Sequence, residues 1–162
     1  MVQKKENKTP NISSQYIVVQ LANEEYGISI VQVERLIQVP EITKVPNMPD
    51  FAEGVINLRG KIIPIIDLRK KFNLPEKEWD DKTRIVVVII ESQTVGLIAD
   101  GVSEVITLDP DQIDEVPSAM STISSVGTEY LKGIGKVGDR LIILMNMDKI
   151  ITSEEKESLK NI

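Results

Sequence analysis

The sequence predicts an all-β protein made of two tandem barrels of about five strands each, with short helical turns and a helix at the C-terminus. Short runs rich in Val and Ile recur along the chain at roughly ten-residue spacing, and Gly or Pro separates them. This spacing is typical of small barrels and sandwiches rather than of a parallel sheet. With 41% hydrophobic but 4% aromatic residues, the chain can bury a core, and that core must be aliphatic.

Two parts of the chain resemble two later parts in the same order. Residues 51–72 align with 130–151, and 15–37 align with 84–106, with glycine on glycine in both alignments. One longer connection in the second half, 107–129, absorbs the difference in spacing. The two colinear matches indicate a duplicated β-unit, and the seam between two such units is a usual place for a binding site.

The predicted organisation has three parts. The first residues carry charges but lack the apolar segment of a secretion signal, so 1–13 is predicted to be a disordered tail. Residues 14–151 are predicted to form one domain of two barrel subdomains, at about 14–75 and 82–151, between which strands can cross over. A capping-box pattern then predicts a C-terminal helix over 152–162.

The first copy begins with a hairpin. Residues 16–21 are rich in β-branched side chains, a polar turn follows, and 26–30 form the returning strand. The mixed segment after it predicts a helical turn at 31–34 that leads into a strand, which Pro40 ends.

The first copy continues with a second hairpin. Residues 54–66 predict a strand, a tight turn and a strand, and Pro64 in the second strand favours an edge or bulge position because proline cannot donate to a ladder. Asp67 is suited to cap a short helix over 68–72.

The second copy repeats this plan. The apolar run 85–90 predicts a strand buried on both faces, and 95–99 and 102–108 predict the next two strands. The long connection 107–129, with its Ser- and Thr-rich patch at 118–125, is predicted to be a loop.

Composition excludes several classes of function. The chain has no histidine and no cysteine, which removes Ser–His–Asp and Cys–His sites, histidine bases and most zinc sites. A net charge of −6 argues against general nucleic-acid binding, which depends on Lys and Arg neutralising phosphates. No stretch approaches the roughly 20 apolar residues of a membrane span, so no membrane insertion is expected. Together with the missing export signal, this predicts a cytoplasmic protein.

Three motifs that hint at chemistry fail in their context. Residues 133–138 match G-x-G-x-x-G, but a strand follows where a dinucleotide site needs a helix. Residues 109–114 lack the glycine and glutamate of a calcium loop. Asp67 and Asp100 are predicted at strand ends of different copies, so a paired acid and base has no support. The sequence therefore predicts neither enzymatic activity nor a cofactor.

Arg59 stands out in the predicted turn of the first copy. The matching position of the second copy is Gly138, so the duplicated scaffold does not require an arginine there. A guanidinium fixed at a turn can bind a partner's carboxylate or carbonyls, although a surface arginine or one paired with a nearby acid stays equally open. Val33 and Leu36 lie near charged residues and belong either to the core or to a partner groove.

Arg59 is also one of five clustered cations. A basic patch and a set of ordinary solvated side chains both remain open, and the latter is favoured. The other members are Lys61, Arg69, Lys70 and Lys71.

The motifs together resemble the CheW family of bacterial chemotaxis coupling proteins. The most specific is G-V-x-N-L-R-G at 54–60, followed by P-x-x-D-L within 63–69. Residues 25–30, 95–105 and 130–134 add further similarity, and the resemblance extends over about 14–151. No segment remains for a receiver, kinase or methylesterase domain, so a stand-alone coupling protein is expected.

The resemblance implies two SH3-like barrels and a non-enzymatic adaptor or scaffold, recruited to receptor arrays at the inner face of the membrane. It would link the cytoplasmic tips of methyl-accepting chemotaxis receptors to the regulatory domain of the histidine kinase CheA. The implied receptor-binding residues are Val33, Gly54, Arg59 and Gly96, and Val105 is implied in kinase binding. Leu36 is predicted to join the receptor site as the apolar neighbour of Val33. An apolar trough with a few charged anchors suits a helix-in-groove contact. A small-ligand-binding β-barrel is the alternative function.

Overall fold

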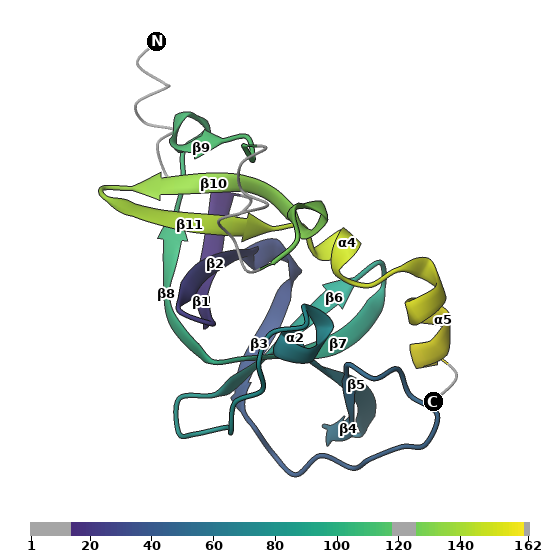
Figure 1. The fold of residues 1–162 in the computed structure, drawn as a ribbon. Helices are drawn as coiled ribbons and strands as arrows, with labels where there is room; N and C mark the ends of the chain where they lie inside the picture. Colours follow the sequence, from purple (N-terminus) through teal and green to yellow (C-terminus); the bar gives the residue numbers. More distant parts are fainter. Residues whose placement is uncertain (1–13, 118–125, 161–162) are drawn as a thin grey trace.

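The computed structural model describes residues 14–117 and 126–160, and the all-β prediction is confirmed. Two mixed sheets, of six and five strands, are accompanied by short helical segments (Figure 1). The expected tail 1–13, the Ser- and Thr-rich patch 118–125 and the last two residues lie outside the described residues.

The six-stranded sheet has the order β8-β1-β2-β11-β10-β9. Its strands are β1 (Gln15–Leu21), β2 (Glu24–Ser29), β8 (Gly101–Thr107), β9 (Ile113–Asp114), β10 (Leu131–Val137) and β11 (Arg140–Met145). The five-stranded sheet has the order β3-β6-β7-β5-β4. Its strands are β3 (Val33–Gln38), β4 (Ala52–Leu58), β5 (Lys61–Asp67), β6 (Arg84–Ile90) and β7 (Gln93–Ala99).

The two sheets do not follow the two halves of the sequence. The hairpin β1–β2 of the first copy pairs with β8 and β11 of the second, whereas the hairpin β6–β7 of the second copy pairs with β3 and β5 of the first. The expected boundaries at about 14–75 and 82–151 therefore do not separate the sheets. The strands cross over, and the whole five-stranded sheet lies between β2 and β8 in the chain.

This exchange is reciprocal. When the aligned segments are matched, β1, β2 and β8 correspond to β6, β7 and β3, and β10 and β11 correspond to β4 and β5. Both sheets then have the same strand order, with one parallel pair each at the same place. Even β9 has a counterpart, because Thr43 forms an isolated bridge with Val55 beside β4. The duplication predicted from the sequence thus corresponds to a matching arrangement of strands.

Alternate residues of the central strands serve two different cores. In β1, Tyr16 and Val18 point into a core enclosed by the six-stranded sheet, while Val19 on the other face joins the seam between the sheets. In β6, Val87 faces the core of the five-stranded sheet and Val86 faces the seam. Successive side chains of a strand point to opposite faces, so a strand with a core on each side must be apolar throughout. This confirms the expected double burial of β6 over 85–88; Ile89 is exposed.

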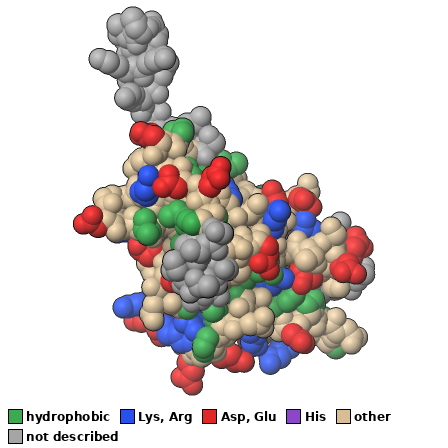
Figure 2. All heavy atoms as spheres, turned by 45° about the horizontal axis from the view of Figure 1, so that its top comes forward, with side chains coloured by type: hydrophobic (Ala, Val, Ile, Leu, Met, Phe, Trp, Pro, Cys, Tyr) green, Lys and Arg blue, Asp and Glu red, His purple; other side chains and the backbone are tan. Residues whose placement is uncertain are grey.

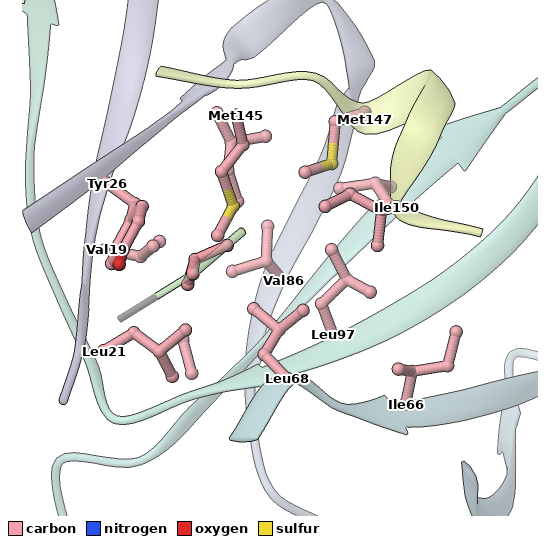
Figure 3. Close-up of a cluster of buried hydrophobic side chains, with 14 of the residues drawn as sticks. Val19, Leu21, Tyr26, Ile66, Leu68, Val86, Leu97, Met145, Met147 and Ile150 are labelled. Carbon is pink, nitrogen blue, oxygen red and sulfur yellow. The ribbon is translucent and has the colours of Figure 1, made fainter. Parts of the chain in front are cut away.

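Among the described residues, the seam is the largest of the three apolar clusters. Figure 3 shows side chains from both sheets meeting there, with Tyr26 and Met145 from one sheet and Val86 and Leu97 from the other. Residues of both sheets are buried together in this cluster, so the seam packs the two sheets against each other.

Two helices near the C-terminus cover this seam, and α2 (Leu68–Lys71) lies between the sheets (Figure 1). The helices near the end are α4 (Met147–Ile150) and α5 (Ser153–Lys160). The predicted caps are present: Asp67 accepts from the Arg69 N–H, and Thr152 and Glu155 exchange two hydrogen bonds. The helical turn expected at 31–34 is a 3-10 turn, η2 (Ile30–Gln32).

Two local expectations were wrong. Pro64 lies in β5, which is flanked by β4 and β7; the pairing with β7 begins only at Ile65, so the missing N–H of Pro64 removes no bond from that ladder. The connection 107–129 is not a plain loop. It contains β9 and two 3-10 turns, η3 (Pro110–Gln112) and η4 (Thr128–Tyr130), because a capping box at Asp109 and pairing with β10 order it.

Candidate interaction groove

A groove of about 550 Å³ runs between the edge strands of the two sheets. One wall is the end of β3 and the other is the first part of β8, and residues of β1 and β6 lie between them. Its lining includes Gln20, Leu36, Gln38, Gly101, Val102 and Val105. Because β3 and β8 are each paired on one side only within the sheets, the groove is bounded by strand edges with unpaired sides.

Two exposed apolar side chains line this groove from different sheets. Leu36 on β3 is 42% exposed and Val105 on β8 is 50% exposed. They are equivalent positions of the two copies, since 15–37 aligns with 84–106. Exposed aliphatic side chains at a concave site favour contact with an apolar partner surface. The structure therefore brings together two predicted site residues that the sequence assigned to different partners.

Arg59 occupies a strained turn outside the groove lining. It is the first residue of the two-residue turn between β4 and β5 and has a φ of 55°. Gly138, at the same place between β10 and β11, has a φ of 60°. Left-handed backbone costs a non-glycine residue about 1 kcal/mol, and the Asn57 side chain supports the turn by accepting from the Gly60 N–H at 2.8 Å. A glycine would fill this position without strain, so the arginine is not explained by the fold.

The Arg59 side chain is exposed and makes no hydrogen bond or ion pair with any residue that the structure describes. It is not among the residues lining the groove, and β3 and β4 form opposite edges of the five-stranded sheet. The expected grouping of Arg59 with Val33 and Leu36 is thus not seen in the groove lining. The guanidinium is nevertheless free to bind a partner.

The chain's similarity to known proteins extends over this whole arrangement. A family model described as CheW-like domain matches residues 15–155. The chain belongs to the CheW family. It is 39% identical to the chemotaxis protein CheW of Klebsiella aerogenes, with 93% of this chain and 89% of the relative covered. It is 35% identical to CheW of Bacillus subtilis, with 88% and 89% covered.

A solved structure supports the same grouping. The crystal structure of the scaffolding protein TtCheW from Thermoanaerobacter tengcongensis matches with a TM-score of 0.80 and 38% sequence identity. The match covers 90% of this chain and 97% of that one. The CheW-family fold is therefore shown by both sequence and structure.

Three further predicted site residues of this CheW-family chain have structural explanations. Val33 begins β3 and packs, partly buried, against the seam. A Cβ on Gly54 would lie 2.2 Å from the Thr43 carbonyl oxygen, and its φ is 147°. A Cβ on Gly96 would lie 2.6 Å from the Ile65 side chain. Gly54 and Gly96 align with glycines of the other copy. Their direct role is in the packing of the fold, and they act on a binding site only indirectly.

The clustered cations do not form a free basic patch. Arg69 pairs with Asp100 at 2.7 Å and Lys70 with Glu53 at 2.6 Å. The two remaining lysines of the cluster have partners as well. Lys71 pairs with Glu155 and lies over the Phe51 ring, and Lys61 donates to Thr94. Figure 2 shows acidic, basic and small hydrophobic areas interspersed on one face of the molecule. Arg59 is thereby singled out from its neighbours.

Asp67 and Asp100, the two aspartates that could be imagined as a paired acid and base, both have structural partners. Burial raises the pKa of Asp67, which caps α2. Burial acts in the same direction on Asp100, but the Arg69 guanidinium and the Ala22 N–H outweigh it and hold the pKa of Asp100 below its usual range. The pairing of Arg69 with Asp100 was missed by sequence analysis; the residues are 31 positions apart and carry no local pattern.

None of the described helices is long and apolar enough to cross a membrane.

Proposed function

We propose that this chain is a non-enzymatic chemotaxis adaptor that couples the cytoplasmic tips of methyl-accepting receptors to the regulatory domain of the histidine kinase CheA. The observation that carries this proposal is the similarity, over nearly the whole chain, to proteins named chemotaxis protein CheW and to a structure titled as a scaffolding protein. Such an adaptor would work in the cytoplasm, recruited to receptor arrays at the inner face of the membrane.

The groove between β3 and β8 is the proposed receptor site. A helical hairpin presents apolar side chains at helical spacing, and these suit a shallow trough with apolar walls and polar ends. Leu36 supplies one wall, and Val33 positions the start of the same strand. Gly54 and Gly96 keep the five-stranded sheet in shape, and Arg59 is proposed as an anchor at the rim of a larger contact surface.

The proposed kinase contact at Val105 can be separated from the receptor contact. An adaptor must hold both partners at once, and Val105 shares a groove with Leu36. Replacing Val105 with Asp and measuring binding to each purified partner decides the assignment. Loss of kinase binding alone supports the proposed role, whereas loss of receptor binding alone places Val105 with Leu36.

The coupling function is tested with Arg59→Glu. The side chain is exposed and unpaired in the described structure, so the variant is expected to fold normally but to co-sediment at least tenfold less with receptor-bearing membranes, the scale expected for losing a charged anchor. Lys149→Glu, with the same charge change at an exposed position of α4, is the matched control. Unchanged co-sedimentation of Arg59→Glu would contradict the proposed anchor, and absent binding by the parent chain would contradict the function itself.

A further inference from the structure

The chain leaves the five-stranded sheet and enters the six-stranded sheet at a single residue. β7 ends at Ala99, β8 begins at Gly101, and Asp100 lies between them. The passage in the other direction, from β2 to β3, runs through the 3-10 turn η2. Contacts that hold Asp100 in place therefore also influence the orientation of one sheet relative to the other.

The carboxylate of Asp100 binds groups from both sides of this passage. It accepts from Arg69 Nε at 2.9 Å and from Arg69 Nη2 at 2.7 Å, through one oxygen each. Arg69 lies in α2, which directly follows β5 of the five-stranded sheet. The second oxygen also accepts from the Ala22 N–H at 2.9 Å, in the turn between β1 and β2 of the six-stranded sheet. One carboxylate thus connects the two sheets.

The contact is partly removed from water. The Arg69 and Asp100 side chains are 14% and 18% exposed. Two parallel bonds between a guanidinium and a carboxylate fix direction as well as distance, which a lysine cannot do. The guanidinium also donates to the Pro75 carbonyl, which holds the chain after α2 against the same point.

The duplicated scaffold does not require this contact. In the alignment of the two copies, Val31 occupies the position of Asp100 and Asp148 occupies the position of Arg69. Val31 is 59% exposed in the equivalent passage between β2 and β3. The same strand arrangement therefore forms at the β2–β3 passage without this ion pair. The Asp100–Arg69 pair is specific to the β7–β8 passage.

That passage borders the groove. The Asp100 N–H donates to the Gln20 carbonyl at 3.0 Å, and Gln20 and Gly101 both line the groove. β8 continues from Gly101 through Val105 as one wall, while the opposite wall, β3, belongs to the five-stranded sheet. A small rotation of one sheet against the other at Asp100 would change the separation of the two walls.

We propose that the Asp100–Arg69 ion pair sets the spacing of β3 and β8 and thereby the affinity of the groove for a helical receptor tip. The two residues are positioning residues, since they act through the strands and line no part of the groove. The inference rests on the proposed function for the identity of the occupant, but its geometric part stands without it.

The binding test uses the full chain with Asp100→Asn and Arg69→Lys, each titrated with a purified cytoplasmic receptor fragment and with the purified kinase regulatory domain. Both variants are expected to weaken receptor binding about two- to thirtyfold, the range by which positions outside a site change affinity. Kinase binding is expected to remain unchanged. Glu155→Gln is the matched control, because it breaks the ion pair of Glu155 with Lys71 away from the groove. Its receptor binding is expected to equal that of the parent at a comparable loss of melting temperature.

The geometric test does not depend on any partner. The chain has no cysteine, so two introduced cysteines, at Ile89 on β6 and at Asp139 in the β10–β11 turn, carry spin labels at defined places on the two sheets. The label-to-label distance distribution is expected to shift or broaden in Asp100→Asn and Arg69→Lys but not in Glu155→Gln. An unchanged distribution, or equal receptor affinity of Asp100→Asn and parent, overturns the proposal. If the parent does not bind the receptor fragment, the proposed function fails, and the distance measurement still decides the role of the ion pair.

Discussion

At the scale of single residues, comparing the two copies distinguishes residues that the fold requires from residues that it does not require. Gly54 and Gly96 both recur as glycines in the other copy, and both are closely approached by neighbouring atoms. Arg59 aligns with a glycine and has a conformation that glycine adopts more easily. An exposed side chain that has no partner among the described residues, at a position where glycine would be less strained, is a candidate for binding.

Replacing Arg59 with Gly is therefore expected to stabilise the protein and weaken its function. The free energy of unfolding should rise by about 0.5 kcal/mol, because relief of the left-handed strain, about 1–2 kcal/mol, exceeds the entropic cost of the added glycine, about 0.5–1 kcal/mol. Urea denaturation measures this change, and co-sedimentation with receptor-bearing membranes should fall as for Arg59→Glu. A variant that lost stability would show that the arginine serves the turn.

Replacing Gly54 with Ala is expected to lower the free energy of unfolding by about 3 kcal/mol. The added Cβ meets a backbone carbonyl oxygen that cannot move aside, at a positive φ that alanine disfavours. Gly60→Ala is the matched control: its φ is 86°, but nothing lies within 4 Å of the added atom, so a loss of only about 1 kcal/mol is expected. Equal losses in urea denaturation would contradict the steric explanation for Gly54.

At the scale of elements, ion pairs join segments that hydrogen-bonded ladders do not reach. α2 is a short helix, yet through Arg69 and Lys71 it is tied to the β7–β8 passage and to α5. Removing one member of a partly buried pair leaves the other without its partner, which costs more than the pair itself contributes.

The Asp100 pair gives the stability a defined pH dependence. The pKa of Asp100 is lower in the folded protein than in the unfolded chain. The ionised carboxylate therefore stabilises the fold fully at a pH above its unfolded-state pKa, and this stabilisation is lost as the pH falls through its folded-state pKa. Asp100→Asn should therefore be about 2 kcal/mol less stable than the parent at pH 7, and the difference should shrink as the carboxylate of the parent becomes protonated. Urea denaturation of both proteins at pH 7, 5 and 3 checks this. If the difference in the free energy of unfolding stayed constant with pH, the charge of Asp100 would not be its cause.

At the scale of the whole molecule, the exchange of hairpins decides which pieces can fold. The fragment 14–75 contains β1–β2 without β8 and β11, and β5 without β7, so it holds neither complete sheet. The fragment 33–99 contains all strands of the five-stranded sheet. Isolated hairpins are marginally stable in water, whereas a complete sheet with an enclosed core can persist.

We therefore expect 14–75 to be unfolded and 33–99 to keep β-structure, as judged by far-ultraviolet circular dichroism and amide chemical-shift dispersion. Fragment 33–99 should also self-associate, because Val86, Leu97 and the rest of its seam face would be exposed. A folded, monomeric 14–75 would contradict the exchanged arrangement.

The sequence was sufficient for the features that local patterns encode. The hairpins, the Asp67 cap and the Thr152–Glu155 capping box all depend on residues close in the chain. So does the contrast between Arg59 and Gly138, which an alignment of the two copies exposes. The place of Pro64 could not be predicted, because its tolerance depends on where a distant strand begins to pair.

What the sequence by itself determined is thus the identity of the strands, their duplication and the family to which the chain belongs. Only the tertiary structure decided that each copy gives its first hairpin to the sheet of the other, that Leu36 and Val105 share one groove, and that Asp100 joins the sheets through Arg69. The physical reason is that β1 and β6 are apolar on both faces, so their patterns fit either sheet equally well. Burial of the shared seam, which involves residues far apart in the chain, selects the exchanged pairing.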